Sequence, residues 1–167
     1  MAEDQCQHLF LDQFGLPYAA IKIHNHIETL SLKSPRFKNW LCRIFYASEQ
    51  KILNNENVTN VLNILKARAE FDGVVRNLSL RVANIAEEPY TVYYDLSNKD
   101  WQVVKITKDG WSVVEYAAVI FRRYSNQQPQ VYPCKSKEYP SDIFDRFMDL
   151  INVKGEDNKL LLKCYII

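Results

Sequence analysis

Glycine is scarce in this chain, with four residues among 167. That scarcity argues against a fold built on glycine-rich loops, such as a dinucleotide-binding fold. No Gly-x-x-x-x-Gly-Lys-Ser/Thr sequence occurs, so the chain by itself is not an NTPase of the P-loop type. It also lacks a Gly-x-Ser-x-Gly elbow, and no cysteine or serine has sequence neighbours that would supply an activating base. We therefore expect a protein that is not an enzyme and that uses no cofactor.

Cysteine pairs and a secretory leader are also missing. The four cysteines are far apart, and no two have the Cys-x-x-Cys spacing of zinc or redox sites. Glu3 and Asp4 precede any apolar run, so no signal peptide is visible. The longest apolar stretches are far shorter than the roughly 20 residues that span a bilayer. These features predict a cytoplasmic protein with reduced thiols and no membrane partner.

An excess of charge of either sign is absent too. The chain has 21 Lys and Arg against 20 Asp and Glu, a net charge of +1. This balance excludes a globally basic nucleic-acid binder but allows a locally basic face. Apolar residues make up 47% and charged residues 25%, which is ordinary for a globular protein and excludes wholesale disorder.

The beginning of the chain predicts a small antiparallel sheet. Apolar-rich segments at 8–12 and 18–23 flank a turn at 13–16, a pattern typical of a hairpin. Residues 27–32 are expected to add a third strand.

Two helices are expected next. Ser34 is a good N-cap and Pro35 suits the first helical position. One apolar helix face follows, made by Phe37, Trp40, Leu41, Ile44 and Phe45. A second helix is predicted from Asn57 to the turn at 71–73.

The period then returns to two, which predicts an antiparallel meander. Leu78, Leu80 and Val82 alternate with polar residues in an expected half-buried strand. Asp109 and Gly110 favour a hairpin with a type I′ turn. Further strands are expected at 90–96, 102–107, 111–114 and 119–122.

The remaining sequence predicts an extended loop at 124–139 and then a helix. Ser141 is expected to cap that helix, which runs to 150 or 151. Its expected buried residues are Ile143, Phe144, Phe147 and Leu150. The chain as a whole predicts an α+β fold, with small antiparallel sheets, a helical pair and a C-terminal helix.

Two pairs of residues are candidate metal ligands. His24 and His26 form a His-x-His pair, which on a strand would place both rings on one face. The nearest further donors are Cys6, His8, Asp12 and Glu28. Asp95 and Asp100 could bind Mg²⁺ as a pair of carboxylates. A polar turn explains each pair better, so we predict no metal site.

Basic residues gather in two segments. One contains Lys33, Arg36, Lys38 and Arg43 without an acidic residue among them. The other contains Arg122, Arg123, Lys135 and Lys137, again without an acid, and adds Tyr124 and Tyr132. Interleaved cations and flat rings are what grooves for single-stranded nucleic acid require. Ordinary solvated faces are the alternative explanation.

Several short phrases together resemble a known region of mobile-element proteins. They lie at 9–13, 34–41, 67–73 and 80–83, with the most specific at 94–96, 104–107, 110–114 and 121–123. The chain resembles a region directly upstream of a P-loop ATPase domain of the replicative-helicase kind. That region occurs in phage, plasmid and mobile-element replication proteins of bacteria and archaea.

The resemblance implies a function and a domain boundary. It implies one α+β accessory domain at 1–155 and, at 156–167, the start of a following ATPase-like domain that is cut short. The implied function is a non-catalytic domain that contacts DNA, with a P-loop ATPase module as partner in cis or in trans. The interleaved cations and rings slightly favour single-stranded DNA. The candidate DNA-binding residues are Arg36, Lys38, Arg43, Arg122, Arg123, Tyr124, Tyr132, Lys135 and Lys137. The alternative is a protein-docking or oligomerisation module without nucleic-acid binding.

Overall fold

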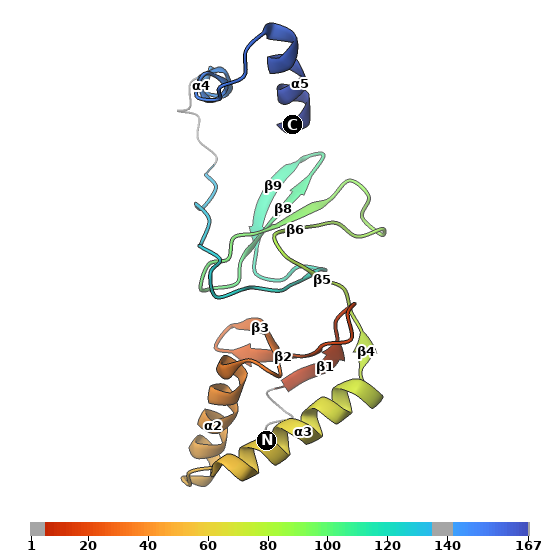
Figure 1. Ribbon diagram of the computed structural model, residues 1–167, viewed down its shortest axis with the longest axis vertical. Helices are drawn as coiled ribbons and strands as arrows, with labels where there is room; N and C mark the ends of the chain where they lie inside the picture. The colour runs from red at the N-terminus through yellow and green to blue at the C-terminus, as the bar shows by residue number, and fades with distance from the viewer. Residues whose placement is uncertain (1–5, 135–141, 167) are drawn as a thin grey trace. The chain divides into compact units, whose positions relative to one another are not determined.

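The computed structural model describes residues 6–134 and 142–166, and the chain forms two compact units, Met1–Val131 and Tyr132–Ile167. Both units are built from the elements labelled in Figure 1, and the expected α+β class, with mostly antiparallel small sheets, is confirmed. The predicted start of a further domain at residue 156 stays a prediction. No helix in the described ranges has both the length and the apolar content that crossing a membrane requires.

The first unit begins with a four-stranded sheet in the order β3-β2-β1-β4. Its strands are β1 (Cys6–Leu11), β2 (Pro17–Ile23), β3 (His26–Ser31) and β4 (Val74–Val75). The two predicted hairpins are confirmed, since β1 pairs with β2 and β2 with β3, both antiparallel. Asp12 closes the first turn, where its Oδ1 accepts hydrogen bonds from the amides of Phe14 (2.9 Å) and Leu16 (2.8 Å). This turn holds the Asp12 carboxylate inside the protein.

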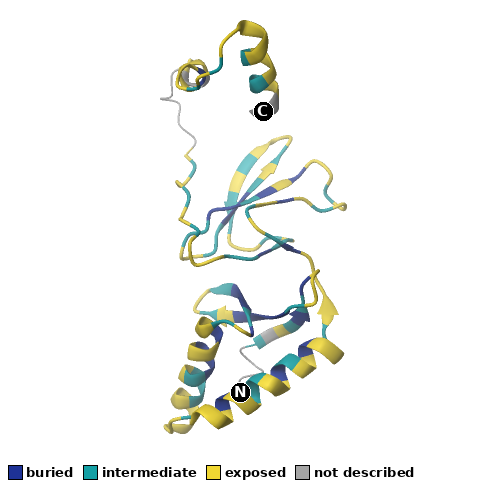
Figure 2. Ribbon diagram, in the orientation of Figure 1, coloured by how far each residue is buried: buried dark blue, intermediate teal, exposed yellow. Residues whose placement is uncertain are grey.

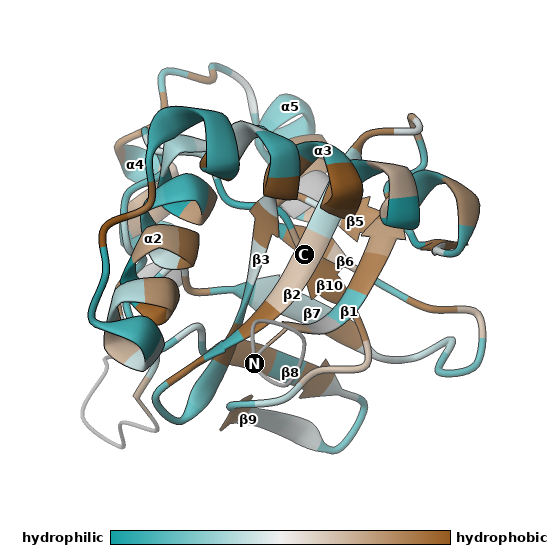
Figure 3. Cartoon of the chain, turned by 90° about the horizontal axis from the view of Figure 1, so that it is seen from below, coloured by the Kyte–Doolittle hydropathy of each residue, from teal (hydrophilic) through white to brown (hydrophobic). Residues whose placement is uncertain are grey.

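Helices α2 (Pro35–Glu49) and α3 (Asn55–Phe71) cover one face of this sheet (Figures 1 and 3). Their apolar stripes pack on the strands, and Figure 2 shows buried residues on the sides that face the sheet. This core consists of Ala19, Ile21, Leu30, Leu32, Phe37, Trp40, Leu41, Leu65 and Ala69. Asn54 caps α3 by accepting from the Asn57 amide (2.7 Å), so this helix begins two residues before the predicted position.

The start of α2 gives a first testable prediction. Ser34 is confirmed as its N-cap, because its hydroxyl oxygen accepts from the Phe37 amide at 3.2 Å. Ser34→Ala should lower the free energy of unfolding by about 1 kcal/mol in a urea titration. Ser48→Ala, in the exposed last turn of the same helix, is the matched control and should leave stability nearly unchanged. Equal midpoints for the two variants would contradict a capping role.

The single strand predicted at 78–82 is wrong. Val74 and Val75 pair with β1, while β5 (Leu78–Ser79) pairs with β10 (Ile120–Phe121). Strand β6 (Val82–Ala83) pairs with β7 (Val92–Asp95). The Gln13 side chain fixes Leu78 through two hydrogen bonds of 2.9 and 3.0 Å to its backbone. The chain therefore passes through three sheets within ten residues, and Leu80 and Val82 are exposed where one strand would have half-buried them.

The third sheet has the order β6-β7-β8-β9. Its longer strands are β7 (Val92–Asp95), β8 (Val103–Thr107) and β9 (Gly110–Val114), which confirm the predicted meander. The predicted type I′ turn between β8 and β9 is wrong. Lys108 and Asp109 lack the positive φ that this turn requires, and Gly110 has φ 131° instead. One face of this sheet is buried by Phe121, which packs with Ala83, Tyr93 and Val103.

The second unit contains α4 (Ile143–Asp149) and α5 (Glu156–Ile166). Lys163 of α5 forms an ion pair with Asp145 of α4 at 2.8 Å. The predicted burial of Phe147 and Leu150 is wrong, because both are exposed, whereas Met148 of α4 is buried. The predicted cap Ser141 and the side chains of Ile143 and Phe144 lie outside the described residues.

Candidate nucleic-acid interface

A groove of about 830 Å³ in the first unit brings together residues from distant parts of the sequence. Its walls are strands β2 and β3, the start of α2, residues 97–101 and residues 122–129. Three predicted residues of the late basic segment, Arg122, Arg123 and Tyr124, line it together with Arg36 of the early segment. Lys99 and Trp101, which the sequence did not suggest, complete the lining, and none of the lining residues is acidic.

Each arginine of the groove is paired with a buried carboxylate. Arg36 lies 2.7 Å from Glu28, Arg122 lies 4.0 Å from Asp12, and Arg123 contacts Asp95. The side chains of Glu28, Asp12 and Asp95 are 2%, 1% and 0% exposed, respectively. They are the buried carboxylates among the described residues. A buried carboxylate fixes the orientation of a guanidinium and offsets much of its charge.

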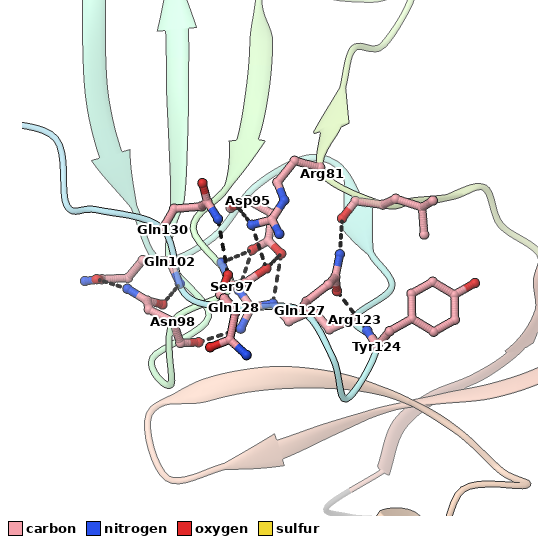
Figure 4. Close-up of polar contacts among 11 residues, drawn as sticks. Arg81, Asp95, Ser97, Asn98, Gln102, Arg123, Tyr124, Gln127, Gln128 and Gln130 are labelled. Atoms are coloured by element: carbon pink, nitrogen blue, oxygen red, sulfur yellow. Dashed lines mark hydrogen bonds and ion pairs between the residues drawn. The ribbon is translucent and has the colours of Figure 1, made fainter.

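Arg123 is the most fully engaged of the three arginines (Figure 4). Its Nε donates to Asp95 Oδ2 at 2.9 Å, its Nη2 donates to Asp95 Oδ1, and its Nη1 donates to the Asn98 carbonyl at 2.6 Å. The guanidinium carbon lies 4.0 Å from the centre of the Trp101 ring. The Arg123 side chain is 12% exposed, against 65% for Arg36. Arg123 therefore holds the groove wall in place more than it faces the groove.

The Asp95 carboxylate also organises the loop at 97–101. Ser97 donates to it through its amide at 3.1 Å and its hydroxyl at 2.8 Å, and Arg81 donates to the Ser97 hydroxyl at 3.1 Å (Figure 4). Ser97 and Trp101 have φ of 49° and 57°, in the left-handed region that non-glycine residues rarely occupy. These contacts keep the loop in an unfavourable conformation that presents Lys99 and Trp101 to the groove.

Arg122 is surrounded by aromatic rings. Its guanidinium carbon lies 4.5 Å from the centre of the Tyr124 ring and 5.8 Å from that of Tyr18. Burial raises the pKa of the Tyr18 phenol above its ordinary value. The 4.0 Å separation from Asp12 exceeds a hydrogen bond, so Arg122 retains N–H groups for an added acceptor. The exposed Tyr124 ring and Arg122 together form a flat, cationic platform.

The structure does not bring the other predicted residues to the groove. Lys38 donates to Asn55 at 3.4 Å, and Arg43 lines a different cavity beside α2. Tyr132 is exposed and belongs to the second unit. Lys135 and Lys137 lie outside the described residues.

The candidate metal ligands are engaged otherwise. His24 lies in the turn between β2 and β3 with φ 51°, and His26 is 3.2 Å from Glu28. Asp95 is paired with Arg123, while Asp100 is exposed. Within residues 6–134 and 142–166, no three His, Cys, Asp or Glu side chains form a group that could hold a metal ion.

Comparison with known proteins gives no match, either to a protein-family model, to a curated protein or to a solved structure. The resemblance to replication proteins therefore stays a prediction.

Proposed function

We propose that the groove binds single-stranded DNA. The observation that carries this proposal is a lining with four cationic side chains, Arg36, Lys99, Arg122 and Arg123, two exposed or half-buried rings and no acid. Cations follow a phosphate backbone, and aromatic faces stack on unpaired bases. A duplex would not expose base faces to Tyr124, which favours the single strand.

The buried carboxylates set the expected strength of this binding. Asp12, Glu28 and Asp95 offset three of the four cations, so the groove carries only a small net positive charge. We expect weak binding in which Arg36 and Lys99 contribute most of the phosphate contacts. Arg122 and Tyr124 would contribute most of the stacking.

The biological context of the proposal comes from the resemblance. The chain would be a non-catalytic accessory domain of a mobile-element DNA replication protein, acting in the cytoplasm with a P-loop ATPase module in cis or in trans. In that setting the groove would hold or guide a strand for the ATPase.

Salt dependence of binding tests the proposal. A labelled single strand and a duplex of the same sequence should be titrated by fluorescence anisotropy between about 50 and 200 mM salt. The Arg36→Gln, Lys99→Gln double variant should bind the single strand more weakly. It should also lower the slope of log affinity against log salt by about 0.7 for each lost phosphate contact.

The matched control is the Lys51→Gln, Lys108→Gln double variant, because both lysines are exposed and neither lines the groove. For this control, the slope of log affinity against log salt should equal that of the wild type. An unchanged slope in the groove variant, or no binding of either probe at low salt, would refute the proposal.

A docking or oligomerisation module is the second candidate function. The observation in its favour is the second unit, where Phe147 of α4, the following Leu150, and Leu160 and Leu161 of α5 are exposed. Sedimentation at increasing protein concentration separates the two functions. Self-association that Leu160→Ser, Leu161→Ser abolishes, together with no DNA binding, would favour this candidate.

A further inference from the structure

A second groove, of about 700 Å³, lies beside α2 in the first unit. Its floor is apolar and is made by residues that also belong to the core or pack against it, including Trp40, Leu41, Ile44 and Val61. Because the core fixes these side chains, the groove exists before any partner arrives. The connection between α2 and α3 adds Leu53 to the floor, and the neighbouring Ile52 is almost fully exposed.

The rim of this groove is mainly cationic. Lys22 and Arg43 line it with His24, against the single acid Glu49. Among the described residues neither Lys22 nor Arg43 takes part in an ion pair or a side-chain hydrogen bond. In this they differ from Arg36, Arg122 and Arg123, which line the first groove. Free cations beside an apolar floor are complementary to a surface that combines apolar and acidic side chains. The basic segment predicted around 33–43 is thus divided, since Arg36 faces one groove and Arg43 the other.

The dimensions favour a helical peptide as occupant. The lining residues of α2 extend from Trp40 to Glu49, which corresponds to roughly 14 Å along the helix axis. A partner helix of two to three turns has that length and would present apolar anchors at i, i+4 and i+7. We propose that this groove docks an acidic amphipathic helix of a partner protein, with its carboxylates beside Lys22 and Arg43. The proposal does not depend on DNA binding.

A peptide selection tests it. The intact chain and its Lys22→Glu, Arg43→Glu variant are each used to select from a displayed library of random 12-residue peptides. The wild type should enrich peptides with apolar residues at helical spacing and Asp or Glu on the flanks. The variant replaces only exposed side chains, and its circular dichroism and thermal midpoint should match the wild type.

The most enriched peptide is then synthesised and measured by anisotropy. The double variant should bind it at least about tenfold more weakly, whereas Lys51→Glu, an exposed lysine outside the lining, should bind it as the wild type does. A single-stranded oligonucleotide should not displace it. Equal enrichment by wild type and variant, or peptides without acidic residues, would overturn the proposal. Binding of laurate with the same dependence on Arg43, but of no peptide, would assign the groove to a small anionic amphiphile instead.

Discussion

Arg123→Ala is expected to lower the free energy of unfolding of the first unit by roughly 3–5 kcal/mol. The reason is the Asp95 carboxylate, which is fully buried and would lose Arg123, its ion-pair partner among the described residues. All three tryptophans lie in this unit, so their fluorescence during a urea titration reports its unfolding. Arg76→Ala, at an exposed arginine outside the groove, should cost far less.

A second variant distinguishes the effect of leaving the Asp95 charge unpaired from the effect of losing the volume of the Arg123 side chain. Asp95→Leu with Arg123→Met replaces both charges by apolar groups and leaves no buried ion unpaired. This double variant should recover part of the stability that Arg123→Ala loses, because the buried charge is gone but Ser97 loses the two hydrogen bonds that it donates to Asp95. A loss below about 1 kcal/mol for Arg123→Ala would show that the buried pair is not needed for the fold.

The same pair has a consequence for binding. Arg123 is a predicted DNA contact, but three of its five N–H groups donate to Asp95 and Asn98. If it acts by holding the loop at 97–101, a variant that is stable but lacks the pair should lose affinity without changing the salt slope. Loss of a phosphate contact would lower that slope.

Local signals explain the part of the fold that the sequence predicts. The hairpins of the first sheet follow from alternating apolar residues around turn residues, and α2 follows from Ser34, Pro35 and a helical apolar period. These patterns are complete within about fifteen residues. The alternation at 78–82 fails for the opposite reason, since its residues pair with strands that are distant in sequence and belong to different sheets.

The groove could be predicted only in part. Arg122 and Tyr124 stand in a basic, aromatic segment that is recognisable by composition. Lys99 and Trp101 follow Asn98 in a stretch typical of a turn. Tertiary contacts place them at the groove, among them the hydrogen bonds around Asp95 and the contact of Arg123 with Trp101. The pairing of each arginine with a buried carboxylate is also a tertiary property, because Glu28 and Asp12 read as ordinary polar residues at a strand and a turn.

Tyr124→Ala is expected to weaken single-strand binding by about 1–3 kcal/mol, or roughly 5- to 150-fold, through the loss of one stacked base. Duplex affinity should change little, because a paired base does not offer its face. Tyr90→Ala is the matched control, since Tyr90 is exposed on a loop outside the groove. The measurement is the same anisotropy titration, with both probes.

Tyr124→Phe distinguishes stacking from the phenol hydroxyl. The ring, and its contact with Arg122 at 4.5 Å, would remain, so this variant should bind like the wild type. The salt slope gives an independent criterion, because an uncharged ring releases no counterions and its removal should leave the slope unchanged. If Tyr124→Ala bound normally, or lowered the slope as the Arg36 and Lys99 variant should, Tyr124 would not be a stacking platform. A loss of affinity at constant slope would instead assign the bases to Tyr124 and the phosphates to Arg36 and Lys99.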